Sequence, residues 1–139
     1  MSILDPYRLY RESQVQTLSQ EKLVLMLYEG AIKFCQQALK ALEQRDYEQM
    51  SYYVGRVQDI LSELMVTLNY EAGDIAHNLY QLYDFMYRWL VEGNVKKSVT
   101  HIRQVRDMLG ELRDTWEEAT RRYHSHDYRT RVGGIEWQG

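Results

Sequence analysis

The sequence predicts an all-α fold, an antiparallel up-down-up-down bundle of four helices. Pro6 is the only proline, so no later residue forbids a long helix. Apolar residues recur at helical spacing over residues 19–45, 46–68, 74–93 and 94–122. The stretches are separated by few residues, and short connections make successive helices antiparallel. A chain of 139 residues therefore fits one bundle domain.

The first two helices have recognisable starts. Ser19 is the expected N-cap of the first, which should end near Arg45. Asp46 followed by Gln49 resembles a capping box and should open the second. Their apolar stripes are expected to face the core, with Leu23, Leu27, Ala31, Phe34, Ala38 and Leu42 in the first and Met50, Tyr53, Val57, Ile60, Leu61, Leu64 and Leu68 in the second.

The third and fourth helices follow a break at residues 69–73. Asp74 should cap the third, which is expected to stop at Gly93, and Asn94 should cap the fourth, which fades near Tyr123. The expected stripes are Ile75, Leu79, Leu82, Tyr83, Met86 and Leu90, then Val95, Val99, Ile102, Val105, Leu109, Leu112, Trp116 and Ala119.

Two flanks and several single residues complete the domain plan. Residues 1–18 are too apolar for a solvated tail and are expected to dock as an N-terminal capping segment on the 19–122 bundle. The tail 123–139 lacks periodicity and is predicted to be disordered. The lone Cys35 is expected in the core. Glycines inside helices suggest close helix approach or backbone exposed to a partner: Gly30, Gly55 and Gly110.

Composition argues against several classes of protein. The net charge of −3 disfavours nucleic acid as a partner. The longest apolar run, residues 23–28, is far too short to insert in a membrane, and a single cysteine fits a reducing cytosolic compartment. No phosphate-binding glycine loop or nucleophile motif is evident, so neither an enzyme nor a cofactor is predicted.

The helices carry more apolar surface than one core can absorb. Six consecutive apolar residues at 23–28 cover the whole circumference of their helix. Residues 79–91 read LYQLYDFMYRWLV, in which ten of thirteen are apolar or aromatic. Either the third helix is covered on most faces by its neighbours, or an exposed groove receives an apolar peptide.

At these residues the sequence resembles the family of the flagellar secretion chaperone FliS. The resemblance covers about residues 5–119 and depends on the order and spacing of several blocks: residues 5–7 (DPY), 23–31 (LVLMLYEGA), 58–64 (QDILSEL), 67–69 (TLN), 82–90 (LYDFMYRWL) and 112–119 (LRDTWEEA). Where the family usually has a second basic residue this chain has Trp89, and where it often has alanine this chain has Gly93.

The resemblance implies a cytosolic export chaperone. It would bind the disordered C-terminal segment of flagellin, prevent premature polymerisation and deliver flagellin to the export gate protein FlhA. The empty site would be capped by Tyr7 and Tyr10. The other residues expected to contact the partner are Leu25, Tyr28, Leu68, Asn69, Tyr83, Tyr87 and Trp116.

Two alternatives from other classes remain open on the residues alone. A helical metalloprotein or small enzyme could use Asp74, His77 and His101, of which only the first pair has the three-residue spacing of a bundle metal site. A homodimer could bury the 74–93 helices against each other. Weak self-association is compatible with a chaperone role.

Overall fold

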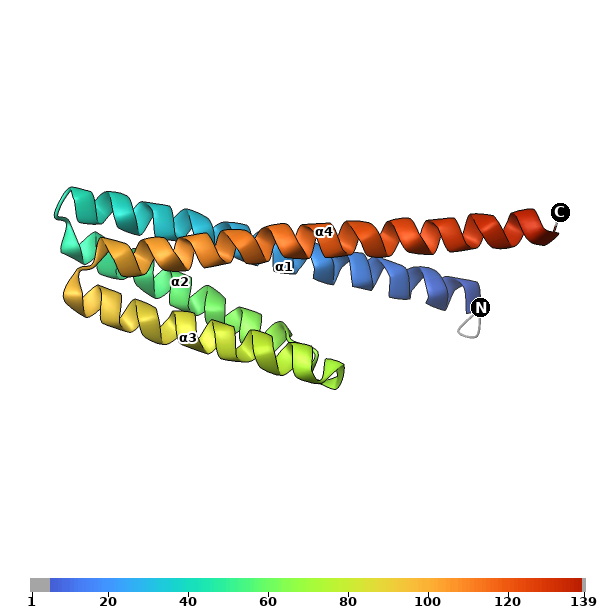
Figure 1. Ribbon diagram of the computed structural model, residues 1–139, viewed down its shortest axis with the longest axis horizontal. Coiled ribbons are helices and arrows are strands. Elements are labelled where there is room, and N and C mark those ends of the chain that lie inside the picture. Colours follow the sequence, from blue (N-terminus) through green and yellow to red (C-terminus); the bar gives the residue numbers. More distant parts are fainter. Residues whose placement is uncertain (1–5, 139) are drawn as a thin grey trace.

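The computed structural model describes the backbone of residues 6–138 and the side chains of residues 19–125. It contains the helices α1 (Pro6–Glu43), α2 (Tyr47–Thr67), α3 (Asp74–Lys96) and α4 (Val99–Gln138), with a 3-10 turn, η1 (Tyr70–Ala72), between α2 and α3. No strand occurs in residues 6–138. Since α1 packs against α2 and α4, and α3 packs against the same two helices, the predicted four-helix bundle is confirmed (Figure 1).

The bundle consists of two helix layers that open like a wedge. In Figure 1, α1 and α4 lie side by side as one layer, and α2 and α3 form the other. The layers are close at the end that holds the α1–α2 and α3–α4 turns, and they diverge toward the α2–α3 turn. Both α1 and α4 continue past that turn. The open end of the wedge is therefore bounded by helices from both layers.

Of the four predicted N-caps, only Asp46 is confirmed. Asp46 Oδ1 accepts a hydrogen bond from the Gln49 N–H at 3.2 Å, while the Asp46 N–H donates to Ala41 O and so does not use the reciprocal half of a capping box. Asp74 does not cap α3, because it is already the first helical residue, and the N-cap position is Gly73, which offers no side-chain hydrogen bond. Asn94 does not cap α4. It lies within α3, and Ser98 Oγ accepts from the His101 N–H at 3.3 Å instead.

Helix α3 ends later than predicted from the sequence, and the backbone at its end shows why. The helix continues three residues past Gly93 and closes on Lys97, whose φ of 52° is left-handed. The Ser98 N–H then donates to Gly93 O at 2.9 Å. A lysine rather than a glycine takes the left-handed position, so the usual glycine signal pointed to the wrong residue.

The two outer helices are longer than expected. Residues 6–18 continue α1 instead of forming a separate segment, and the backbone is helical to Gln138 where a disordered tail was predicted from residue 123. Between Pro6 and Gly30 no helix-breaking residue interrupts α1, so Ser19 does not act as an N-cap. The side chains of Tyr7 and Tyr10 lie outside the described side chains.

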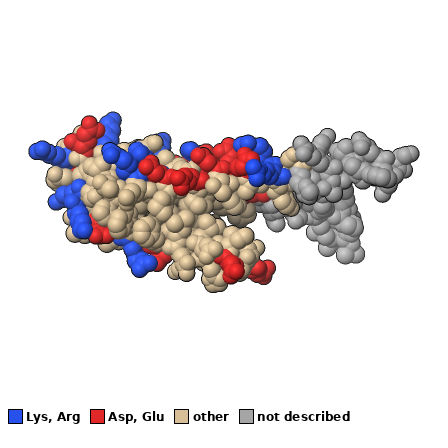
Figure 2. Space-filling model, in the orientation of Figure 1, with Lys and Arg blue, Asp and Glu red and all other residues tan. Residues whose placement is uncertain are grey.

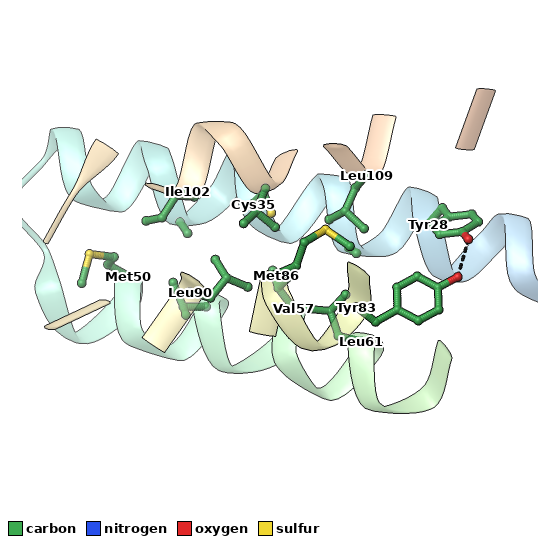
Figure 3. Close-up of a cluster of buried hydrophobic side chains, with 14 of the residues drawn as sticks. Tyr28, Cys35, Met50, Val57, Leu61, Tyr83, Met86, Leu90, Ile102 and Leu109 are labelled. Carbon is green, nitrogen blue, oxygen red and sulfur yellow. Dashed lines mark hydrogen bonds between the residues drawn. The ribbon is translucent and has the colours of Figure 1, made fainter. Parts of the chain in front are cut away.

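The predicted stripes of α2 and α4 hold most of the buried residues of these helices, whereas the buried face is rotated from the predicted stripe in α1 and at the start of α3. In α1, Leu23 is 42% exposed, whereas Tyr28 and Cys35 are buried. In α3, Ile75 is 68% exposed and its neighbour Ala76 is buried. Most of the α1 residues that face the bundle core are small, and small residues let neighbouring helices approach closely. The core side chains include Ala31, Ala38, Met50, Val54, Val57, Leu61, Leu64, Met86, Leu90, Ile102, Val105 and Leu109 (Figure 3).

Close helix approach occurs at a glycine other than the three expected. A Cβ built on Gly55 or Gly110 would meet no atom within 4 Å, and one on Gly30 would make an ordinary contact with Ile60 at 3.5 Å. A Cβ on Gly93 would lie 2.6 Å from the Cβ of His101, which no real contact allows. The packing of α3 on α4 therefore requires glycine at position 93.

Cys35 is fully buried, as predicted, and its thiol should make the folding stability of the protein fall at alkaline pH. Burial raises the pKa of its thiol from 9.0 to about 12, and the Arg106 guanidinium acts in the opposite direction. The unfolded thiol ionises above pH 9 while the folded one stays protonated, so stability should fall from pH 9 toward 12 by about 1 kcal/mol per pH unit.

Chemical denaturation at pH 8 and pH 10.5 tests this coupling. The wild type should lose more unfolding free energy between the two pH values than Cys35→Ala, because the tyrosines titrate equally in both proteins. Equal losses would contradict a thiol contribution.

Candidate binding site

An apolar pocket lies at the open end of the wedge. It encloses about 220 Å³, and none of the residues among 19–125 that line it is charged. Its lining comes from all four helices and from the α2–α3 turn: Val24, Tyr28, Thr67, Leu68, Asn69, Ala72, Ile75, Ala76, Leu79, Tyr83 and Trp116. A pocket of this composition favours an apolar side chain and offers few polar contacts to orient it.

Tyr28 of α1 and Tyr83 of α3 link two helices that are diagonal in the bundle. Their hydroxyl oxygens are 2.5 Å apart, and their ring centroids are 6.5 Å apart (Figure 3). Each side chain is only 2% exposed. Burial raises the pKa of both hydroxyls, so both stay protonated at neutral pH.

The wall formed by α1 and α4 is held by contacts that are distant in sequence. Trp116 Nε1 donates to the backbone carbonyl of Glu21 at 3.0 Å. His124 Nε2 lies 2.7 Å from Glu21 Oε2. Because the indole N–H is already bonded within the protein, Trp116 presents its apolar ring to the pocket.

The opposite wall is the α2–α3 turn, whose backbone is fixed by local side-chain bonds. Asn69 Oδ1 accepts from the Glu71 N–H at 3.1 Å, and Thr67 Oγ1 donates to Leu64 O at 2.8 Å. Gly73 has a φ of 73°, a conformation that favours glycine. The TLN block of the sequence thus builds the turn, and Leu68 within it lies on the pocket.

Five of the nine predicted site residues line this one pocket: Tyr28, Leu68, Asn69, Tyr83 and Trp116. Leu25 and Tyr87 do not line it. Leu25 is half-buried on α1, and Tyr87 packs beside the core, where its carbonyl accepts from Gln58 Nε2 at 3.3 Å. The structure does not describe the side chains of Tyr7 and Tyr10.

Sequence reasoning missed six lining residues. Ile75 and Leu79 belong to the predicted core stripe, and Ala72 and Ala76 carry no signal of their own. Val24 lies in the run of six apolar residues, so that excess of apolar positions was the available clue. The sixth residue, Thr67, belongs to the TLN block.

Exposed apolar side chains continue beyond the pocket along α3. In Figure 2, Lys and Arg gather at the end with the α1–α2 and α3–α4 turns, while much of the surface over α2 and α3 is uncharged. The large apolar side chains of α3 that are at least 42% exposed are Ile75, Tyr80, Phe85, Val91 and Val95. Exposed apolar side chains next to an apolar pocket favour an interaction site.

Asp74, His77 and His101, the residues of the metalloprotein alternative, do not form a metal-binding group. No three His, Cys, Asp or Glu residues among them lie close enough together to hold a metal ion. His77 packs edge-on against Tyr70. His101 is committed to a different contact, since its Nδ1 lies 2.7 Å from Ser98 Oγ and its ring stacks on Trp89.

Trp89 and Gly93, the two positions expected to depart from the pattern of the family that the sequence resembles, meet at His101. The Trp89 ring stacks on the His101 ring at 4.1 Å and donates from Nε1 to Gln104 Oε1 at 2.7 Å. Gly93 lies against the Cβ of the same histidine. Neither Trp89 nor Gly93 lines the pocket, so these departures concern the packing of α3 on α4.

Comparison with known proteins agrees with this architecture. The family model described as "Flagellar protein FliS" matches residues 3–123 of this sequence. This chain belongs to the FliS family. It is similar to the flagellar secretion chaperone FliS of Bacillus subtilis, with 34% identity over 86% of this chain and 89% of that one. The Campylobacter jejuni chaperone is 36% identical over 81% and 88% of the two chains, and that of Vibrio cholerae is 33% identical over 82% and 85%.

Family membership indicates a chaperone role in flagellar export and no enzymatic activity. The FliS resemblance predicted from the sequence is thereby confirmed. Among the described helices, none is long and apolar enough to cross a membrane. The apolar pocket, and not a reactive centre, is the feature of this FliS-family chain that could serve such a role.

Proposed function

We propose that this FliS-family chain binds the disordered C-terminal segment of flagellin and keeps it from polymerising before export. The observation that carries the proposal is the uncharged pocket between the two helix layers, which unites five residues predicted as partner contacts. Pocket residues Tyr28, Leu68, Asn69, Tyr83 and Trp116 would receive the segment, with Leu25 and Tyr87 supporting it from outside the pocket.

The physical basis is coupled folding of the client. A disordered segment can wrap a large surface, and the exposed apolar side chains of α3 would extend the contact beyond the pocket. Burying the client's apolar face occupies the surface through which it would self-associate. No nucleotide or cofactor is needed, because binding energy alone holds the client.

Calorimetric titration with a peptide of the last ~40 residues of flagellin from the same organism tests this proposal. We expect saturable 1:1 binding with favourable enthalpy and a negative heat-capacity change. A peptide of the same composition in scrambled order is the control. Absence of heat and of co-elution at concentrations near 100 µM would reject flagellin as the client. Sedimentation of the same samples distinguishes the complex with the peptide from a homodimer without client.

Delivery to the export gate protein FlhA in the cytosol is a second part of the proposal, supported by the family resemblance. The test is co-sedimentation of the chaperone with the soluble part of FlhA, with and without the flagellin peptide. We expect the complex with peptide to bind more tightly. Equal or weaker binding in the presence of client would contradict a delivery role.

We further propose that residues 1–18 cover the empty pocket and leave when the client binds. In this structure residues 6–18 extend α1, so capping requires that α1 open near Ser19. Because a cap reduces the fraction of protein with an accessible site, Tyr7→Ala/Tyr10→Ala should raise the apparent affinity for the flagellin peptide by about 3- to 10-fold.

Titration and thermal melts of the full-length variant measure this effect. Tyr52→Ala, which removes an exposed tyrosine of α2 outside the pocket lining, is the control and should leave affinity nearly unchanged. A loss of affinity in the Tyr7/Tyr10 variant would contradict a cap and would indicate that these tyrosines contact the client.

A further inference from the structure

The Tyr28–Tyr83 pair holds one hydroxyl hydrogen that the bond between them does not use. Each phenol carries a single hydrogen, and the 2.5 Å contact consumes one of the two. Among the described side chains and backbone groups, no second hydrogen-bond partner of either oxygen is present. Both side chains are 2% exposed, so bulk water has little access to them.

The open space beside the pair is the pocket, which both tyrosines line. A buried hydroxyl without an acceptor is costly, and a ligand that supplies an acceptor recovers that cost. Burial raises the pKa of both phenols and keeps them as donors at neutral pH. The pair is therefore a neutral donor next to an otherwise apolar pocket.

We propose that the Tyr28–Tyr83 pair donates one hydrogen bond to a main-chain carbonyl of the client, next to the apolar side chain that fills the pocket. This inference depends on the proposed binding of flagellin. A carboxylate is a poor acceptor here, because the lining residues whose side chains are described include no cation to pair with the buried charge.

The proposed bond restricts the conformation of the client at this point. Carbonyls inside a helix are already bonded, so the accepting residue belongs to an extended stretch or to the last turn of a helix. The pocket would thus recognise an apolar residue at a place where the client's backbone is not helical. Binding of a continuous helix interior is disfavoured.

Conservative substitutions separate this role from a purely structural one. Either hydroxyl can donate to the other, and the pair always retains one spare hydrogen. Tyr28→Phe or Tyr83→Phe removes one hydroxyl and still leaves one donor. The double variant leaves none. We expect each single change to alter the dissociation constant by less than about threefold and the double change to weaken binding by about tenfold.

Folding stability should follow a different pattern from affinity, because each single change should already have nearly the full effect. The first substitution already breaks the bond between α1 and α3, so the second should cost little more. Melts of the two single variants and the double variant would then be nearly the same. If the bond between the two tyrosines only holds the bundle together, affinity should follow the same pattern as stability. Each single variant would then bind the peptide as weakly as the double variant.

The experiment is calorimetric titration of the flagellin peptide into wild type, both single variants, the double variant and Tyr52→Phe. Tyr52 is 58% exposed and outside the pocket lining, so its loss of a hydroxyl should have no effect. If wild type does not bind the peptide, the proposed function fails. If wild type binds and the double variant stays within about threefold of it, or a single variant matches the double, the inference about the tyrosine pair is overturned.

Discussion

Replacing Leu68 with aspartate is expected to weaken binding of the flagellin peptide by about 100-fold, since a client would bury an unpaired charge. Leu68 lines the pocket just after α2, where the described lining residues include no cation to pair with the new carboxylate. The side chain is only half-buried in the free protein, so the unfolding free energy should fall by only about 1–2 kcal/mol.

Val66→Asp is the matched control for this charge. Val66 is 77% exposed, lies two residues earlier in the last turn of α2 and does not line the pocket. The two variants share the cost of an acid near a helix C-terminus. Titration and urea denaturation of both should show a large affinity loss in Leu68→Asp alone. Equal losses in both would mean that the pocket is not the main contact.

Replacing Gly93 with alanine is expected to lower the unfolding free energy by about 1–3 kcal/mol, the usual cost of overpacking. Alanine favours helix by about 1 kcal/mol over glycine, but the added methyl would lie 2.6 Å from the Cβ of His101. Relief requires α3 to move from α4, which would also disturb the stack of Trp89 on His101. Tryptophan fluorescence during urea denaturation reports both effects.

Gly110→Ala is the control for the substitution itself. Gly110 is also inside a helix, and a Cβ there would meet no atom within 4 Å. Its replacement should therefore raise the unfolding free energy by about 0.5–1 kcal/mol. Changes of opposite sign at the two glycines would demonstrate that close packing requires Gly93. Stabilisation by both alanines would contradict the tight contact with His101.

Local signals in the sequence predicted much of the bundle. Asp46 starts α2 because an acceptor side chain can reach an N–H three residues ahead. The number of helices and their antiparallel order follow from apolar periodicity and short connections. The end of α3 escaped prediction because Lys97, and not a glycine, takes the left-handed conformation.

The candidate site was only partly predictable. Motif blocks pointed to Leu68, Asn69, Tyr83 and Trp116, and the pocket unites them. Tyr28 and Tyr83 are 55 residues apart, and Trp116 bonds to a carbonyl 95 residues away. No periodicity within one helix contains that information.

The sequence by itself determined the helical class and the antiparallel order, since these depend on apolar periodicity and short connections, and it determined the family through the order and spacing of the motif blocks. The tertiary structure decided how the buried faces of α1 and of the start of α3 are turned, where the two layers diverge and why Gly93 faces His101. These features depend on how the volumes of side chains from different helices fit together. Such a fit is settled only when the helices pack.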